Sequence, residues 1–197
     1  MRLHWRTTLA LLGMTVCTAA AAAQCAGVTM PERLQTDGAT LRLNGLGLRE
    51  ATVFNIDVYV AALYLPDRDA PVIGRDAGRI LAATTPRQLR LALLRDVSVA
   101  DMRSNIQAGF QRAAGPAADR YRGPLSQLIA WIPPLSAGDC FTLDYRPDRG
   151  LQVRHQDTVL GTLPGADFAS LLFAIWLGDR PLSPALKAGL MGAPCRN

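Results

Sequence analysis

The sequence has few lysines and histidines, and this scarcity limits the functions that it can serve. Lys187 is the only lysine, and the 2 histidines are His4 and His155. The arginines are scattered among acidic residues. They form no basic stripe with interleaved aromatic side chains, the pattern by which many nucleic-acid-binding proteins are recognised. We therefore expect no nucleic-acid partner.

Motifs of several enzyme classes are also missing. Gly45 and Gly47 lack the third glycine and the following helix of a dinucleotide-binding turn. The chain has no Gly-x-Ser-x-Gly elbow, and His155 has no neighbours that would complete a catalytic triad or a metal site. The cysteine spacings match neither a zinc site nor a Cys-x-x-Cys redox motif. We expect neither a metal nor a cofactor.

Only the N-terminus carries a long apolar run. Residues 9–20 are mostly apolar, Arg2 and Arg6 precede them, and the alanines at 21–23 supply the small residues of a signal-peptidase site. We predict a signal peptide over residues 1–23 and a periplasmic or secreted protein. The run is too short for a permanent membrane span, which needs roughly 20 apolar residues. No comparable stretch follows, so we expect no integral membrane span.

Cleavage before Gln24 leaves residues 24–197, which we expect to form a single domain. The alternative is a lipoprotein signal that ends at Cys25, although Gln24 is not the small residue that lipidation prefers before the cysteine. Loss of Arg2 and Arg6 lowers the formal net charge from +5 to +3.

Three cysteines remain after this cleavage: Cys25, Cys140 and Cys195. An oxidising compartment favours one disulfide and one odd thiol. The sequence does not select the pair. If Cys25 carried a lipid, Cys140 and Cys195 would be the natural pair.

The pattern of apolar residues predicts strands and helices that are segregated along the chain. Alternating apolar and polar positions, rich in β-branched and aromatic residues, indicate an extended lead at 28–34 and strands at 39–44, 51–65, 88–94, 139–145, 150–155 and 158–163. Helical periodicity and capping residues indicate helices at 99–114, 118–132, 166–177 and 185–190, with an ambiguous short helix within 70–83. Blocks of strands and helices, rather than βαβ alternation, indicate an α+β fold.

The glycines within 45–47 interrupt the strand pattern, and we interpret them as a turn that presents Arg49 at the mouth of the following strand. An arginine in that position can hold an anion. The ordinary alternative is an ion pair with Glu50 or Asp57, since surface arginines commonly form such pairs. If the guanidinium is buried, it needs an acid partner such as Asp57 or Asp101.

Aromatic residues add one expectation about the two faces of the sheet. Tyr59 and Tyr64 are separated by an odd number of residues in one strand, so their side chains are expected on opposite faces. One of them should line the core or a cleft. Trp131 and Trp176 are expected to fill the core or to roof that cleft.

Three stretches resemble the chalcone isomerase fold family, in particular its bacterial exported branch. Residues 44–49 (Asn-Gly-Leu-Gly-Leu-Arg) resemble the Gly-x-Gly-x-Arg turn of the family, and residues 58–65 resemble its next strand. Residues 173–183 resemble its C-terminal helix junction, and the resemblance extends from about Val28 to Leu190. It implies a large antiparallel sheet with a layer of helices on one face and a ligand cleft between them.

The resemblance also implies roles for individual residues. The family includes plant enzymes that cyclise chalcones and non-catalytic relatives that bind fatty acids, and both use an arginine at the position of Arg49. Tyr59 stands where the enzymes have threonine and the fatty-acid binders have tyrosine. The helix after Ser98 offers Asn105 but no tyrosine, and Ile175 aligns with a threonine that touches the substrate. The arginine is thus kept while most of its polar helpers are not.

These residues lead to one expected function and two alternatives. We expect a non-catalytic protein that binds a small apolar anion such as a fatty acid, with Arg49, Tyr59, Asn105 and Ile175 at the ligand. The first alternative is an isomerase or intramolecular lyase for an α,β-unsaturated ketone, in which Arg49 stabilises the enolate. The second is a module that binds a protein partner and fills its pocket with its own side chains.

Overall fold

The computed structural model describes residues 22–36, 38–51, 56–82 and 84–195. The predicted signal peptide lies outside the described residues except for Ala22 and Ala23, which belong to the first strand. Within the described ranges, no helix is long and apolar enough to cross a lipid bilayer.

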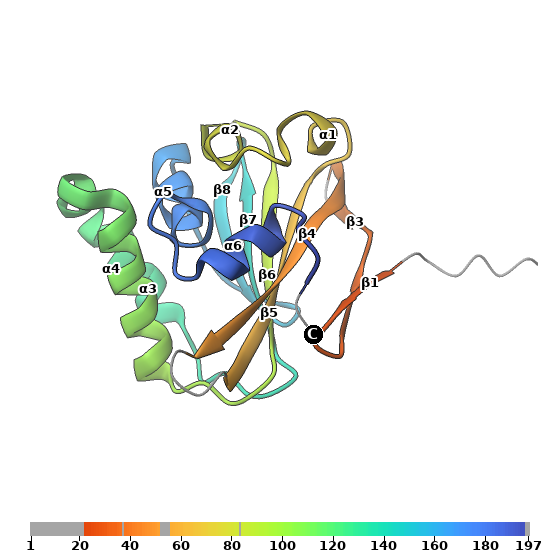
Figure 1. Ribbon diagram of the computed structural model, residues 1–197. Coiled ribbons are helices and arrows are strands. Elements are labelled where there is room, and N and C mark those ends of the chain that lie inside the picture. The colour runs from red at the N-terminus through yellow and green to blue at the C-terminus, as the bar shows by residue number, and fades with distance from the viewer. Residues whose placement is uncertain (1–21, 37, 52–55, 83, 196–197) are drawn as a thin grey trace, which may run out of the picture.

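A seven-stranded antiparallel sheet, in the order β3-β4-β5-β6-β7-β8-β9, forms the body of the molecule (Figure 1). Each strand pairs with the next one in the sequence, so the expected α+β fold with a large antiparallel sheet is confirmed. The strands are β3 (Arg33–Thr36), β4 (Ala39–Ala51), β5 (Ile56–Pro66), β6 (Arg87–Leu93), β7 (Cys140–Arg146), β8 (Gly150–His155) and β9 (Thr158–Leu163).

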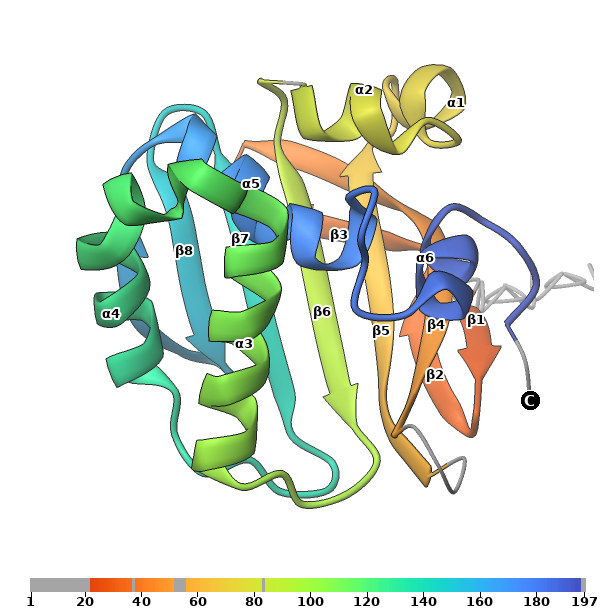
Figure 2. The ribbon, with the colours of Figure 1, turned by 60° about the vertical axis from the view of Figure 1, so that its left-hand side comes forward.

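Helices cover one face and one end of this sheet (Figure 2). They are α1 (Ala70–Ile73), α2 (Ala77–Ala82), α3 (Val99–Ala114), α4 (Arg122–Trp131), α5 (Ala166–Leu177) and α6 (Pro184–Leu190), with a 3-10 helix, η1 (Gly115–Tyr121), before α4. Ser98 and Ser183 cap α3 and α6 by accepting hydrogen bonds from the backbone amides of Asp101 and Leu186, as their positions predicted.

The predicted turn at Gly45 and Gly47 is wrong, because β4 runs through both glycines without a break. A side chain at Gly45 would overlap the carbonyl oxygen of Gly189, and one at Gly47 would overlap that of Leu186. The glycines therefore let α6 pack directly on the backbone of β4. They serve the close approach of two elements rather than a change of chain direction.

Two other boundaries differ from prediction. The strand expected from residue 51 begins at Ile56 in the structure, and residues 52–55 lie outside the described ranges. The helix expected over 118–132 is divided between η1 and α4. The ambiguous segment 70–83 contains the two short helices α1 and α2.

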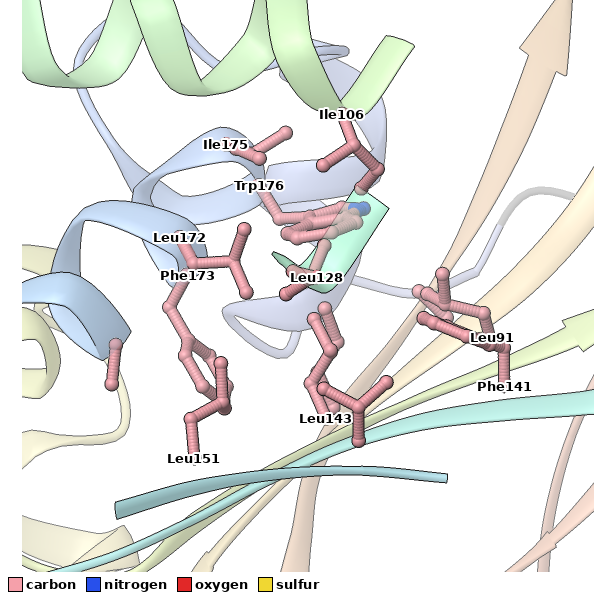
Figure 3. Packing of buried hydrophobic residues seen from close by; sticks show 14 of the residues in the cluster. Leu91, Ile106, Leu128, Phe141, Leu143, Leu151, Leu172, Phe173, Ile175 and Trp176 are labelled. Carbon is pink, nitrogen blue, oxygen red and sulfur yellow. The ribbon is translucent and has the colours of Figure 1, made fainter. Parts of the chain in front are cut away.

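The main core lies between the sheet and the helices (Figure 3). Leu91, Phe141 and Leu143 face it from β6 and β7, and each is completely buried. The helices contribute Ile106, Leu128, Leu172, Phe173, Ile175 and Trp176. This helical side of the sheet is called the inner face below.

The outer face is covered in part by a hairpin of β1 (Ala22–Cys25) and β2 (Val28–Pro31). Under it lies a smaller apolar cluster that includes Met30 and Tyr64. Tyr64 belongs to this cluster and Tyr59 to the inner core, which confirms that the two tyrosines point to opposite faces.

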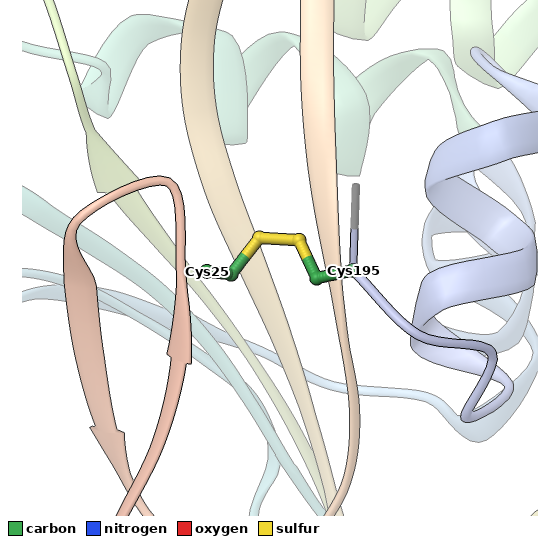
Figure 4. Close-up of a disulfide and its surroundings, with 2 residues drawn as sticks. All are labelled: Cys25 and Cys195. Atoms are coloured by element: carbon green, nitrogen blue, oxygen red, sulfur yellow. A yellow bond between two sulfur atoms is a disulfide. The ribbon is translucent and has the colours of Figure 1, made fainter. Parts of the chain in front are cut away.

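A disulfide joins this hairpin to the C-terminal segment of the chain (Figure 4). It links Cys25 to Cys195, whose Cα atoms are 5.7 Å apart, and Cys140 is a free thiol. The sequence alone did not determine which cysteines form the disulfide. In the structure, the bonded cysteines lie near the two ends of the described chain.

Candidate functional site

A small apolar cavity of about 90 Å³ lies between β5, α3 and α5, and all four predicted ligand-binding residues line it. Arg49, Tyr59, Asn105 and Ile175 come from β4, β5, α3 and α5 respectively. Arg49 is half-buried and Asn105 is exposed, so these two mark the open end of the cavity. The rest of the lining is mainly apolar and includes Leu93, Met102, Ile106 and Trp176.

The sheet register places Arg49 beside Tyr59. The two residues are direct partners in the β4–β5 pair, and Tyr59 is in turn the partner of Leu93 on β6. Directly paired residues on neighbouring antiparallel strands project from the same face, with Cβ atoms roughly 5 Å apart. The guanidinium, the phenol and an apolar wall residue therefore share one row across the sheet.

The Tyr59 hydroxyl is held by the indole of Trp176. The Trp176 Nε1 donates a hydrogen bond of 3.0 Å to the Tyr59 Oη. Burial raises the pKa of Tyr59 to about 12, and the neighbouring positive charge of Arg49 acts in the opposite direction. In the described part of the chain the Tyr59 hydroxyl has no acceptor for its own proton. A neutral phenol here can donate that proton to a ligand oxygen.

The ion pair that sequence alone allowed for Arg49 is not formed. The Arg49 Nη1 donates to the carbonyl oxygen of Glu50, and no carboxylate of the described residues lies within 4.0 Å of the guanidinium. Asp101 instead accepts a hydrogen bond from the Ser98 hydroxyl. A half-buried cation without an acid partner retains the capacity to bind an anion.

The site offers little for proton abstraction. Arg49, Tyr59 and Asn105 are the polar side chains that line the cavity, and no histidine or carboxylate of the described residues joins them. A general base should have a pKa near the working pH. Because burial raises the pKa of Tyr59 to about 12, its hydroxyl is poorly suited to accept a proton at neutral pH.

Sequence reasoning missed most of the apolar wall. Leu93, Val97 and Leu182 line the cavity together with Met102 and Ile106. Each looked like an ordinary core residue, and only the β5–β6 register shows that Leu93 lies beside Tyr59. Trp176 was expected in the core or the roof, and its indole nitrogen reaches the site through Tyr59.

A second buried cation lies at the other end of β6 and is structural. Arg87 is 1% exposed, and its guanidinium carbon lies 4.5 Å from the ring centroid of Tyr145 and 5.1 Å from that of Phe173. Its Nη2 donates to the Ser170 hydroxyl at 2.8 Å, which donates in turn to the Leu81 carbonyl. Burial lowers the pKa of Arg87 to about 10. These contacts fasten β6 to α5.

His155 is also engaged structurally. Its Nε2 lies 2.9 Å from an oxygen of Asp139, which also accepts hydrogen bonds from the Ser136 amide and the Gln156 side chain. These bonds, the Ser136 amide first, lower the pKa of Asp139. Within the described ranges no three His, Cys, Asp or Glu side chains are grouped so that they could hold a metal ion.

Comparisons with known proteins point to one family. A comparison with curated proteins gives no match. Among solved structures, the chain is similar to a fatty-acid-binding protein of Arabidopsis thaliana, with a TM-score of 0.66 and 16% identity over 84% of this chain and 92% of that one. The family described as chalcone isomerase-like matches residues 22–192. That match spans nearly all described residues, and the chain therefore belongs to the chalcone isomerase-like family.

Proposed function

We propose that the protein binds a small apolar anion, with a fatty acid as the type of ligand. The carboxylate lies against Arg49 and accepts a hydrogen bond from Tyr59, and the apolar tail enters the cavity between Met102, Ile106 and Ile175. The observation that carries the proposal is the Arg49–Tyr59 pair. A guanidinium without an acid partner stands at the open end of an apolar cavity, beside a buried hydroxyl with an unused proton.

The similar structure supports this proposal at the level of the fold. That protein is named for fatty-acid binding, and its identity of 16% to this chain shows shared architecture rather than a shared ligand. The Arg49–Tyr59 geometry is observed in this chain itself and does not depend on that similarity.

The size of the cavity limits the ligand. Its volume is about 90 Å³. Pockets for drug-sized ligands are several times larger, about 300–1,000 Å³. A short acid fits most readily. A long chain enters only if side chains of α3 move, and Met102 is suited to this because methionine is unbranched and flexible.

An isomerase or lyase is the second candidate function, and one observation favours it. The same Arg49–Tyr59 pair offers two donors to an enolate oxygen, which is how such an intermediate is stabilised. The lack of a proton acceptor among the described lining residues weighs against it.

Export is proposed as well, because the N-terminal segment has the pattern of a signal peptide and the disulfide suits an oxidising compartment.

Native mass spectrometry tests the binding proposal. Mature protein purified from a periplasm should carry an acid that is missing from Arg49→Ala. Arg112→Ala is the matched control, because Arg112 is an exposed arginine of α3 outside the cavity lining. A bound acid that persists in Arg49→Ala would contradict the proposal. An empty wild-type protein that turns over an α,β-unsaturated ketone, with loss in Tyr59→Phe, would favour the isomerase.

A further inference from the structure

The outer face of the sheet carries a polar hollow that is separate from the cavity under the helices. Its volume is about 260 Å³. Strands β6, β7 and β8 form its floor, and Leu34, Gln35 and Thr36 of β3 form a wall. Because β3 and β8 stand far apart in the strand order, the sheet must curl to bring both to one hollow. This hollow is called the outer groove.

The floor of the outer groove is built from two rows of paired residues. Arg90, Thr142 and Arg154 are cross-strand partners on β6, β7 and β8. A second row consists of Gln88, Asp144 and Gln152, each two positions along its strand from the member of the first row. Paired residues share a face, so both rows project their polar side chains into the same hollow.

Several of these polar side chains are deeply buried. Gln88 is 6% exposed, Thr142 5%, Asp144 9% and Arg146 7%. Burying polar and charged groups is unfavourable unless each group finds a partner. A patch of this kind on the uncovered half of a sheet calls for a reason beyond solubility.

Among the described residues, no carboxylate forms an ion pair with Arg90 or Arg154 of the groove. Asp144 is held by Arg146, whose Nε and Nη2 donate to its two oxygens at 3.0 and 3.4 Å. Arg154 donates to the carbonyl oxygen of Asp157 rather than to its carboxylate. Arg90 forms no ion pair with any described residue, and its buried Nε has no hydrogen-bond partner.

Two guanidinium groups thus stand on either side of Thr142 in one row. Arg90 and Arg154 are half-buried and lie on the two strands that flank β7, so their positive charges add to one potential over Thr142. An anion over Thr142 would lie between these two positive charges and accept a hydrogen bond from the threonine hydroxyl.

We propose that the outer groove binds a small hydrophilic anion that carries carboxylate or phosphate groups. Arg90 and Arg154 hold the charge, and Thr142 and Gln152 contact the polar body of the ligand. The hollow is too small for a protein segment with its own fold, and its polar floor disfavours the apolar acid proposed for the inner cavity. The two sites therefore take anions of different chemistry on opposite faces of one sheet.

Isothermal titration with citrate and with inorganic phosphate, at matched ionic strength in sodium chloride, tests this proposal. We expect saturable binding of one anion per chain, and the arm with the higher affinity distinguishes a carboxylate from a phosphate ligand. Arg90→Gln should weaken binding ~10-fold or more, since it removes a partly buried charge partner. Arg120→Gln, an exposed arginine of η1 outside the groove, is the matched control and should bind like the wild type.

Two further variants keep the test decisive. Arg154→Gln should weaken binding in the same direction and replaces Arg90→Gln if that variant fails to fold. Arg49→Ala should bind citrate or phosphate like the wild type, because Arg49 lies on the inner face. Absence of saturable binding by the wild type, or affinities that Arg90→Gln and Arg154→Gln leave unchanged, would overturn the proposal. A loss in Arg49→Ala equal to that in Arg90→Gln would also overturn it, since it would place the anion in the inner cavity.

Discussion

The two faces of the sheet differ in where their charged side chains lie. On the inner face, Arg49 stands at the rim of an apolar cavity. The neutral hydroxyl of Tyr59 lines the same cavity and accepts a hydrogen bond from the Trp176 indole. On the outer face, arginines, glutamines and an aspartate lie directly on the strands, beside an apolar patch that the β1–β2 hairpin covers. One face is suited to an amphipathic acid and the other to a hydrophilic anion.

The difference follows from the alternation of side chains along each strand. On β6, Leu89, Leu91 and Leu93 face the helices, while Gln88 and Arg90 face outward. A single strand therefore contributes to two sites of different chemistry. We therefore expect that a substitution at one site leaves binding at the other site unchanged.

Loss of the disulfide, which fastens the outer hairpin to the C-terminal segment, should have the largest effect on stability. Cys25→Ser combined with Cys195→Ser releases a cross-link between residues 170 positions apart. Removal of such a disulfide typically costs about 2–5 kcal/mol. Thermal and denaturant unfolding measure this loss, and Cys140→Ser is the control, because Cys140 is a free thiol. Equal stability of the double variant and the control would contradict the prediction.

A methyl group at Gly47 should weaken the packing of α6 on β4. In Gly47→Ala the new Cβ would overlap the Leu186 carbonyl, so the helix must shift. Overpacking of this kind costs about 1–3 kcal/mol. The midpoint of denaturant unfolding reports the change. Gly123→Ala is the matched control, since its Cβ would have no neighbour within 4 Å, and a cost as large as that of Gly47→Ala would refute the packing argument.

Alkaline pH should probe both faces through their tyrosines. Burial raises the pKa of Tyr59 and of Tyr64 to about 12, above the usual value of 10.0. The folded state thus keeps these protons when the unfolded state loses them. The stabilisation is complete below pH 10 and is lost as the pH rises toward 12, by up to about 1.4 kcal/mol per pH unit for each tyrosine.

The matched variants Tyr59→Phe and Tyr64→Phe separate the two faces in this experiment. Each should reduce the slope of unfolding free energy against pH between pH 10 and 12, and each should do so by a similar amount. Tyr59→Phe should also weaken acid binding, while Tyr64→Phe should not, because Tyr64 lies under the hairpin and donates to the Pro31 carbonyl. An unchanged slope in both variants would show that these tyrosines do not titrate with unfolding.

The parts of the fold that depend on local chemistry could be predicted from sequence. The Ser98 and Ser183 caps and the three strands of the β7–β9 meander all lie within a residue or two of their expected positions. Each depends on residues that are close in the chain. The α+β arrangement follows from their order and is confirmed.

Features that depend on distant partners could not be predicted in the same way. The glycines of β4 looked like a turn because their partner, α6, lies some 140 residues further along the chain. The Cys25–Cys195 pair joins opposite ends of the chain. The placement of Arg49, Tyr59, Asn105 and Ile175 around one cavity was expected from the family resemblance. The missing acid partner of Arg49 is visible only in three dimensions.

The central claim is that Arg49 holds the charged end of an apolar ligand, and a calorimetric titration tests it most directly. A short-chain, a medium-chain and a long-chain saturated acid, each beside the alcohol of equal length, are titrated into wild-type protein, Arg49→Ala and the Arg112→Ala control. We predict that the wild type and the control prefer each bound acid to its alcohol. Arg49→Ala should lose about 2–5 kcal/mol of acid binding, an affinity loss of about 30-fold or more, and should leave alcohol binding unchanged. An acid preference that survives in Arg49→Ala, or no binding of any acid by the wild type, would contradict the account.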